Sequence, residues 1–175
     1  VLLDWVGRFA VSNKGPRDLV TEADVASQRE IRRILLDGFP EHDFVGEESL
    51  PEHVAAGRQV GTDGPQYRWV VDPLDGTSNY VHGFPAWCVS IAQAAGDELL
   101  VGTVYDPQRD ECYSAERGRG ATLNGQPIAA ARTPSLAESL VALSFPPHVE
   151  PGSPAISDFL AVLPRVHSVR RSGST

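Results

Sequence analysis

The feature that most constrains this chain is an apolar run that passes directly into two closely spaced aspartates, Asp72 and Asp75. The residues before them, 68–71 (Arg-Trp-Val-Val), predict a short strand of the kind found inside a sheet that is covered on both faces. Pro73 restricts Asp72 to extended backbone and excludes a helix through the motif. We therefore expect Asp72 to end the strand and Asp75 to return beside it across a turn, so that two carboxylates share one site.

The residues that follow favour an anion site. Gly76 allows a ligand to approach the backbone closely, and residues 77–79 (Thr-Ser-Asn) are helix N-cap types that leave N–H groups free to bind an anion. Two carboxylates about 4 Å apart repel by roughly 4 kcal/mol at an effective dielectric of 20, and a phosphate would add to that repulsion. Oxygen ligands of this kind select a hard cation such as magnesium. Taken alone, Asp-Pro or Asp-Gly is more often a plain turn, so the specificity lies in the whole run.

The clearest predicted helix begins at residues 21–24 (Thr-Glu-Ala-Asp), a capping-box pattern with Asp in place of the usual Glu. Ile31, Ile34 and Leu35 recur on one face, and Gly38 ends the helix. We expect Trp69, Phe84 and Trp87 to be core aromatic residues.

The rest of the chain predicts short strands and one further helix. Turn signals at 96–97 and 106–107 separate β-branched and apolar runs, which is typical of an antiparallel meander, and Asn-Gly at 124–125 favours a tight turn. The expected elements are the meander over 86–123, a strand at 127–128, a strand over 139–145, a helix over 157–163, a strand over 166–170, and a loop over 51–66 with room for a short helix.

Composition excludes several classes of protein. The chain has 175 residues, with 15 Lys and Arg against 23 Asp and Glu and a formal net charge of −8. This size suits one soluble domain, and the acidic balance argues against a general nucleic-acid or lipid-surface binder. The longest apolar run is too short to span a membrane, and no secretory signal is visible. Cys88 and Cys112 lack ligand-spaced partners, so we expect buried, reduced thiols of a cytosolic protein.

Three motifs in order resemble one known family. Residues 72–79, Asp-Pro-Leu-Asp-Gly-Thr-Ser-Asn, closely resemble the signature of the inositol monophosphatase family, which comprises magnesium-dependent, lithium-sensitive phosphatases. Residues 46–49, Gly-Glu-Glu-Ser, are similar to the metal-binding element of that family, and residues 18–24 resemble its N-terminal Asp-Leu-Val-Thr-x-x-Asp. Residues 124–125 and 171–175 also fall where the family has a turn and a substrate-side loop.

The resemblance implies an α+β fold, a layered α-β-α-β sandwich of the inositol monophosphatase and fructose-1,6-bisphosphatase type. We expect residues 1–175 to form a single domain that contains the N-terminal metal-binding part and lacks the C-terminal part of the family fold. The chain begins at Val1, contains no Met, and does not reach the Trp-Asp motif that carries the family's remaining metal carboxylate. On this interpretation the chain is a fragment, and we expect at most trace phosphatase activity from it alone.

The resemblance also implies two or three magnesium ions. Glu47, Asp72 and the main-chain carbonyl of Leu74 would hold the first ion, and Asp72 and Asp75 would serve the second. The alternative for Glu47 and its neighbour Glu48 is an exposed acidic pair, and we keep that interpretation for Glu48.

The implied catalytic residues are Glu47, Asp24 and Thr77, of which Asp24 and Thr77 would orient and deprotonate the attacking water. The alternative for Asp24 is helix capping alone. The resemblance implies that the substrate is bound by Asp75, Gly76, Thr77, Ser78, Gly173, Ser174 and Thr175.

The expected function is a magnesium-dependent phosphomonoesterase that hydrolyses inositol monophosphate, or a similar polyol or sugar phosphate, by in-line attack of water. The resemblance further implies a cytoplasmic homodimer that binds a small-molecule phosphate monoester and neither nucleic acid nor membrane. Two kinds of alternative stay open. One is another phosphatase of the superfamily, acting on histidinol phosphate, fructose 1,6-bisphosphate or 3′-phosphoadenosine 5′-phosphate. The other is a non-catalytic regulatory or binding module.

Overall fold

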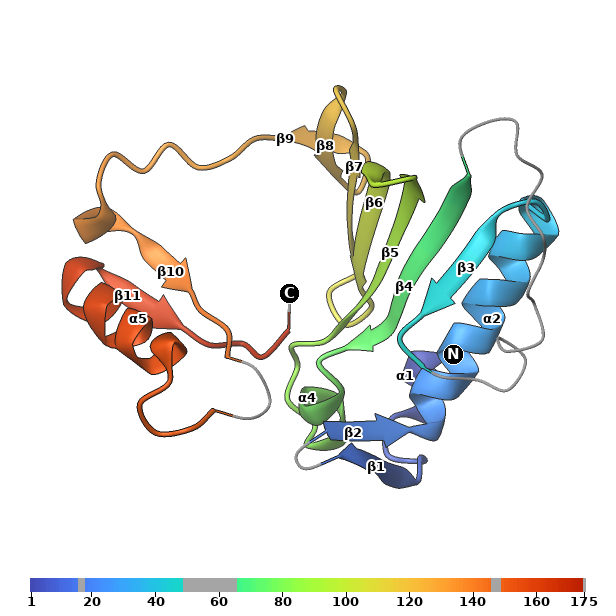
Figure 1. Cartoon of the computed structure of the whole chain (residues 1–175), viewed down its shortest axis with the longest axis horizontal. Helices are drawn as coiled ribbons and strands as arrows, with labels where there is room; N and C mark the ends of the chain where they lie inside the picture. The colour runs from blue at the N-terminus through green and yellow to red at the C-terminus, as the bar shows by residue number, and fades with distance from the viewer. Residues whose placement is uncertain (16–17, 49–65, 146–148, 175) are drawn as a thin grey trace.

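The structure is a computed structural model that describes residues 1–15, 18–48, 66–145 and 149–174, without the side chains of 13–15 and 18. A seven-stranded sheet stands at the centre, α2 covers one of its faces, and the last described segment lies on the other side (Figure 1). No helix within these ranges is both long and apolar enough to cross a membrane. Residues 51–65 of the loop predicted over 51–66, and Thr175, lie outside the described residues.

The large sheet has the strand order β3-β4-β5-β6-β7-β8-β9. β3 and β4 are parallel and every later pair is antiparallel, so the predicted meander is confirmed and ends in one further short strand. The predicted tight turn is present, with positive φ at Asn124 (49°) and Gly125 (77°). The strands are β3 (Asp43–Gly46), β4 (Tyr67–Asp75), β5 (Cys88–Ala95), β6 (Glu98–Asp106), β7 (Glu111–Glu116), β8 (Gly120–Leu123) and β9 (Gln126–Ile128).

Helix α2 (Glu22–Gly38) follows the predicted boundaries. Thr21 caps it, and Asp24 completes the capping box through the backbone of Thr21. The prediction for Ile34 was wrong, because its side chain is 55% exposed. The buried stripe of α2 instead runs through Ala23, Asp24, Ser27 and Gln28, and this stripe packs against β4.

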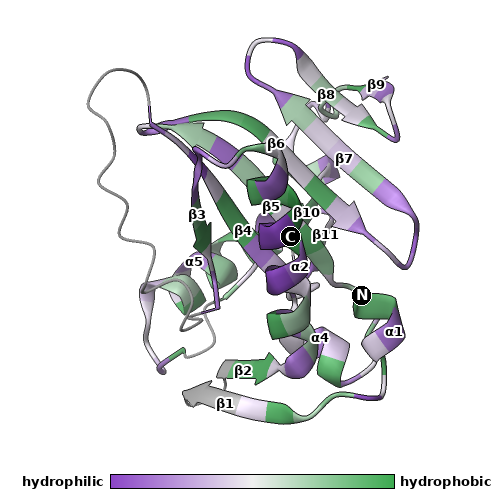
Figure 2. Cartoon of the chain, turned by 90° about the vertical axis from the view of Figure 1, so that its right-hand side faces the viewer, coloured by the Kyte–Doolittle hydropathy of each residue, from purple (hydrophilic) through white to green (hydrophobic). Residues whose placement is uncertain are grey.

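The buried core lies at the end of the sheet where β4 passes into α4 (Thr77–Val81). Figure 2 shows apolar stretches of α1 (Leu2–Trp5), β2 (Asp18–Thr21) and α4 gathered at this end, beside β1 (Val11–Gly15). Trp87 is buried as predicted, Trp69 is half-buried, and Phe84 is 52% exposed, so the prediction for Phe84 was wrong. The core cluster consists of Leu2, Ala23, Leu74, Tyr80 and Trp87.

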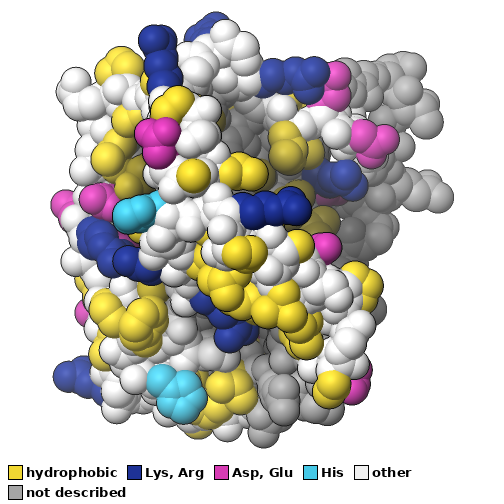
Figure 3. All heavy atoms as spheres, turned by 90° about the vertical axis from the view of Figure 1, so that its left-hand side faces the viewer, with side chains coloured by type: hydrophobic (Ala, Val, Ile, Leu, Met, Phe, Trp, Pro, Cys, Tyr) yellow, Lys and Arg dark blue, Asp and Glu magenta, His cyan; other side chains and the backbone are white. Residues whose placement is uncertain are grey.

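The last described segment forms a small unit in which β10 pairs in parallel with β11. Its helix begins three residues earlier than predicted, because Pro154 suits the first helical position. β10 is shorter than predicted, since its one partner strand has three residues. Figure 3 shows hydrophobic side chains exposed on this side of the molecule. The elements are η1 (Leu136–Glu138), β10 (Leu140–Ala142), α5 (Pro154–Val162), η2 (Leu163–Arg165) and β11 (Ser168–Arg170).

Candidate active site

The two signature aspartates lie on a single bulged strand. Asp72 pairs with Ser90 and Asp75 pairs with Cys88, so two residues of β4 stand opposite one residue of β5 between these pairs. The prediction that Asp72 ends the strand and that a turn follows was wrong. Pro73 has no N–H to donate and interrupts the ladder only locally, which produces a bulge. The bulge places the two carboxylates near one another on one strand end.

The backbone of the bulge is fixed by side chains around it. The Asp72 carboxylate accepts a hydrogen bond from the Leu74 N–H at 3.1 Å, and the Leu74 carbonyl accepts one from the Thr77 hydroxyl at 3.1 Å. The Leu74 side chain is 1% exposed and anchors the bulge in the core. The Leu74 carbonyl is therefore held on the same side as the Thr77 hydroxyl.

Glu47 reaches the same place from the neighbouring parallel strand. It follows directly after β3, and its N–H donates to the Val71 carbonyl at 3.0 Å. Burial and the adjacent Glu47 carboxylate, to which it is hydrogen-bonded, raise the pKa of Asp72 to about 7. Such a rise is what two acidic groups produce when they share a site that holds no cation. Glu48, expected to be exposed, is 4% exposed, so that prediction was wrong.

Asp24 carries out two tasks with its two oxygens. Oδ2 accepts from the Thr21 N–H at 2.9 Å and thereby closes the capping box. Oδ1 accepts a hydrogen bond from the Thr77 hydroxyl at 3.0 Å. Asp24 is fully buried, and burial raises the pKa of its carboxyl, although the hydrogen bonds from Thr21 and Thr77 oppose the rise. Capping alone therefore does not describe Asp24.

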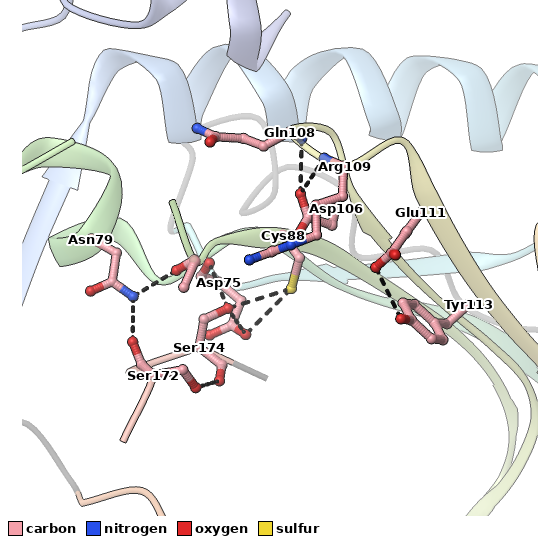
Figure 4. A network of polar contacts seen from close by, with 11 residues as sticks. Asp75, Asn79, Cys88, Asp106, Gln108, Arg109, Glu111, Tyr113, Ser172 and Ser174 are labelled. Carbon is pink, nitrogen blue, oxygen red and sulfur yellow. Dashed lines mark hydrogen bonds and ion pairs between the residues drawn. The ribbon is translucent and has the colours of Figure 1, made fainter. Parts of the chain in front are cut away.

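Asp75 points toward the last described residues. Its Oδ2 accepts a hydrogen bond from the Ser174 hydroxyl at 2.9 Å, and the Cys88 thiol donates to the same oxygen at 3.5 Å (Figure 4). Within the described ranges, no three His, Cys, Asp or Glu side chains already stand together as a metal site.

The start of α4 is shaped by Gly76. Its φ is +89°, and a Cβ at this position would lie 2.9 Å from the Ala86 carbonyl oxygen and 3.0 Å from Ser174 Cβ. Only glycine adopts this conformation without strain at so close an approach. The Ser174 side chain therefore lies directly against the start of α4.

Asn79 joins this segment to α4. Its Nδ2 donates to the Ser172 carbonyl at 2.7 Å and to the Ala86 carbonyl at 2.6 Å. Ser78 and Gly173, both predicted substrate residues, line a cavity of about 520 Å³ together with Asn79 and Ser172. Ser174 lines a second cavity of similar size beside Cys88 and Asp106 (Figure 4).

Cys88 is buried, and burial raises the pKa of its thiol to about 11. The predicted reduced, buried thiol is confirmed for Cys88, whereas Cys112 is only half-buried.

Four residues that lie around the site were not identified from the sequence, namely Asn79, Cys88, Ser27 and Gln28. Asn79 and Cys88 contact the site through bonds between distant segments. Ser27 and Gln28 had a usable signal, because they are polar residues on the helical stripe that Ile31 and Leu35 continue.

Comparison with known proteins gives one consistent result. The profile of the inositol monophosphatase family matches residues 5–175. An inositol-1-monophosphatase of Rhizobium meliloti (strain 1021) is 37% identical over 172 residues, covering 97% of this chain and 61% of that protein. Inositol monophosphatase 1 of Solanum lycopersicum is 47% identical over 131 residues, covering 75% of this chain and 46% of that protein.

A solved structure agrees with these sequence matches. The extragenic suppressor protein suhB of Bartonella henselae matches with a TM-score of 0.82 and 33% identity, over 99% of this chain and 65% of that chain. The chain thus spans between 46% and 65% of the length of these three relatives.

Proposed function

Because the chain belongs to the inositol monophosphatase family, we propose that it forms the metal-binding and water-activating side of a magnesium-dependent phosphomonoesterase. The proposed substrate is inositol monophosphate or a similar polyol or sugar phosphate. The observation that carries the proposal is the contact between the carboxyl group of Glu47, directly after β3, and that of Asp72, at the bulge of the adjacent parallel strand β4. Neighbouring carboxylates in that position need a cation to be ionised together at neutral pH.

The donors present fit magnesium. All of them are oxygens, namely the carboxylates of Glu47, Asp72 and Asp75 and the carbonyl of Leu74, and such ligands suit a hard divalent ion. Glu47, Asp72 and Leu74 would hold one ion, and Asp72 with Asp75 would serve another. Bound ions of this kind supply positive charge at the attacking and leaving oxygens of an in-line displacement.

Thr77 and Asp24 would prepare the nucleophile. The Thr77 hydroxyl donates to Asp24, so its oxygen lone pairs are left to accept a hydrogen bond from the attacking water. As Thr77 takes the proton of that water, its own hydroxyl proton would pass to Asp24. Burial favours the protonated form of Asp24, which suits a group that takes up a proton during the reaction. Because Asp24 is fixed by the capping box, the pair is positioned before substrate arrives.

The rest of the site would bind the phosphate ester. The N–H groups of Gly76 and Thr77 stand at the beginning of α4, where no intrahelical acceptor uses them, and would donate to phosphate oxygens. Ser78, Gly173 and Ser174 would complete the substrate side.

Hydrolysis of inositol 1-phosphate tests the proposal. Phosphate release is measured across a magnesium titration, in this chain and in any longer protein that contains it. We expect Asp72→Asn to lower kcat at least about 1,000-fold, which corresponds to roughly 4 kcal/mol of transition-state stabilisation. The matched control is Asp97→Asn, since Asp97 is an exposed turn residue far from the site.

Three results would count against the proposal. Hydrolysis that persists in chelator, or an Asp72→Asn rate within about tenfold of the wild type, would contradict a magnesium mechanism. Magnesium binding without turnover of any phosphate ester in the superfamily's range, by this chain and by a longer protein that contains it, would favour a regulatory or binding module instead.

A further inference from the structure

Three buried polar side chains lie close together on α2, within about one and a half helical turns, and face the site. Asp24 and Gln28 are fully buried, and Ser27 is 4% exposed. Each one binds a different segment: Asp24 binds Thr77, Ser27 donates to the Pro73 carbonyl at 3.0 Å, and Gln28 binds the backbone after β3. Buried polar groups on a core-facing stripe are costly unless they are bonded, so this arrangement calls for an explanation beyond packing.

The Gln28 side chain pairs with the backbone of Glu48 as another strand would. Its Nε2 donates to the Glu48 carbonyl at 2.7 Å, and its Oε1 accepts from the Glu48 N–H at 2.8 Å. Both donor and acceptor of one carboxamide are thus used by a single residue of the chain. These two hydrogen bonds fix both the position and the orientation of the peptide groups beside Glu47.

Gly46 shows how closely the carboxamide lies against this backbone. A Cβ at Gly46 would be 2.2 Å from Gln28 Oε1, 2.4 Å from Cδ and 2.8 Å from Nε2. Gln28 therefore contacts the chain on both sides of Glu47, across Gly46 before it and through the bonds to Glu48 after it.

The neighbouring Ser27 holds the other acidic segment. Pro73, whose carbonyl it binds, lies directly between Asp72 and Leu74. Two adjacent residues of one rigid helix thus fix the backbones that carry Glu47 and Asp72. Because the two carboxyl groups are in contact and repel when ionised, their segments would separate if nothing held them.

We propose that Gln28 and Ser27 are positioning residues that set the separation of Glu47 and Asp72, and thereby the magnesium affinity of the site. This inference rests on the proposed function. Outer hydrogen-bond partners of metal ligands typically contribute about 10–100-fold to metal affinity, because they orient the ligands before the ion arrives. We expect a loss of that size when the Gln28 carboxamide is removed.

The test measures the magnesium dissociation constant by titration calorimetry. The temperature is kept well below the melting temperature of each variant, so that only folded protein is observed. Gln28→Met keeps the length of the side chain and removes both hydrogen bonds, and we expect magnesium binding at least about tenfold weaker. Ser27→Ala removes one bond with little change in volume, and we expect a weakening of about three- to tenfold. The matched control is Leu35→Ala, about two helical turns beyond Gln28. We expect it to lower stability and to leave the magnesium affinity unchanged.

Gly46→Ala provides an independent route to the same end, because the new methyl group must displace the Gln28 carboxamide. We expect weakened magnesium binding and a lower melting temperature. Gln28→Ala combined with Gly46→Ala relieves the clash, so the double variant should recover part of the stability lost in Gly46→Ala but none of the affinity.

The outcomes separate this inference from the proposed function. If the wild-type chain binds no magnesium, the proposed function fails and this inference fails with it. If the wild type binds magnesium and Gln28→Met or Ser27→Ala binds it within twofold of the wild type, the inference alone is overturned and both residues are structural. If Gln28→Met does not fold, Ser27→Ala and Gly46→Ala decide the question, since each keeps the carboxamide in the chain.

Discussion

Asp72 makes the metal-free protein sensitive to pH. Its pKa of about 7 in the folded state lies above that of an exposed carboxyl, near 4. Between these values the folded chain binds a proton that the unfolded chain has released, so stability falls as the pH rises from about 4 to about 7 and is level above that. Since Asp72 is partly exposed, solvent screening reduces the effect, and we expect a loss of about 1–2 kcal/mol.

Denaturant titrations in chelator between pH 4 and pH 8 measure this loss. Asp72→Asn has no charge to lose and should remove most of the slope, and it should be the more stable protein at pH 8. If the free energy of unfolding of the wild type changes with pH in the same way as that of Asp72→Asn, the raised pKa of Asp72 is contradicted.

Asp75 should be essential for turnover and of little importance for stability. Asn at this position keeps an oxygen to accept from Ser174, so we expect Asp75→Asn to change the free energy of unfolding by less than about 1 kcal/mol. We expect its rate of phosphate release to fall by more than tenfold, because a metal charge is lost. Rates and denaturation curves for Asp75→Asn and the control Asp97→Asn check both parts, and a rate above a tenth of the wild type would remove Asp75 from the metal ligands.

Cys88 should react slowly with thiol reagents, since burial both covers its thiol and raises its pKa to about 11. Alkylation by iodoacetamide at pH 8 in Cys112→Ser, which leaves Cys88 as its one thiol, measures this directly. We expect modification to become fast only in denaturant. Modification of the native variant at the rate of the denatured one would show that Cys88 is not enclosed as described.

Predictions for single residues were correct where a sequence motif fixes the backbone. They were wrong where contacts between distant segments determine whether a side chain is buried. Asp24 and Thr77 were paired by resemblance alone, and the structure brings them within hydrogen-bond distance. Glu48 was expected to be exposed, because a sequence of two glutamates does not show that Gln28 draws the second one inward. The position of Gln28 on a buried stripe was visible, but its partner was not.

At the level of elements, the capping box of α2 also serves the site, because Asp24 belongs to both. We expect Thr21→Ala to cost about 1–2 kcal/mol of unfolding free energy, since two backbone N–H groups at the helix start lose their acceptor. Thr21→Ser keeps the hydroxyl and should retain most of that stability. Urea denaturation in chelator compares the two variants, and equal losses in both would show that the cap contributes little.

The predicted elements were largely correct in type, and the α+β fold of the inositol monophosphatase type is confirmed by the structural match. The largest error concerned β4, which continues through a bulge to Asp75 instead of ending at Asp72. Proline correctly signalled an interruption of the ladder, but sequence alone does not show that pairing with Cys88 resumes beyond it. The start of α5 differs from the prediction because Pro154 suits the first helical position, and the length of β10 follows that of its three-residue partner β11.

On the scale of the whole molecule, the site joins segments that are far apart in the sequence. The start of α2, the end of β3, the bulge of β4 and the segment around Ser174 meet at one end of the sheet, next to the core (Figure 1). A ligand that binds there would contact segments that are far apart in the described chain. Its binding should therefore raise the free energy of unfolding of the whole fold. The size of this increase depends on how tightly the native state binds the ligand.

The measurement that tests this account most directly is the melting temperature of the chain in chelator and in increasing magnesium, for the wild type and Asp72→Asn. At a magnesium concentration 100 times the dissociation constant, mass action adds about 2.7 kcal/mol of stability, which corresponds to a rise of several degrees for a chain of this size. We predict that rise in the wild type and its absence in Asp72→Asn. A wild-type midpoint that is the same in chelator and in millimolar magnesium would contradict the assignment of Glu47 and Asp72 as a metal site.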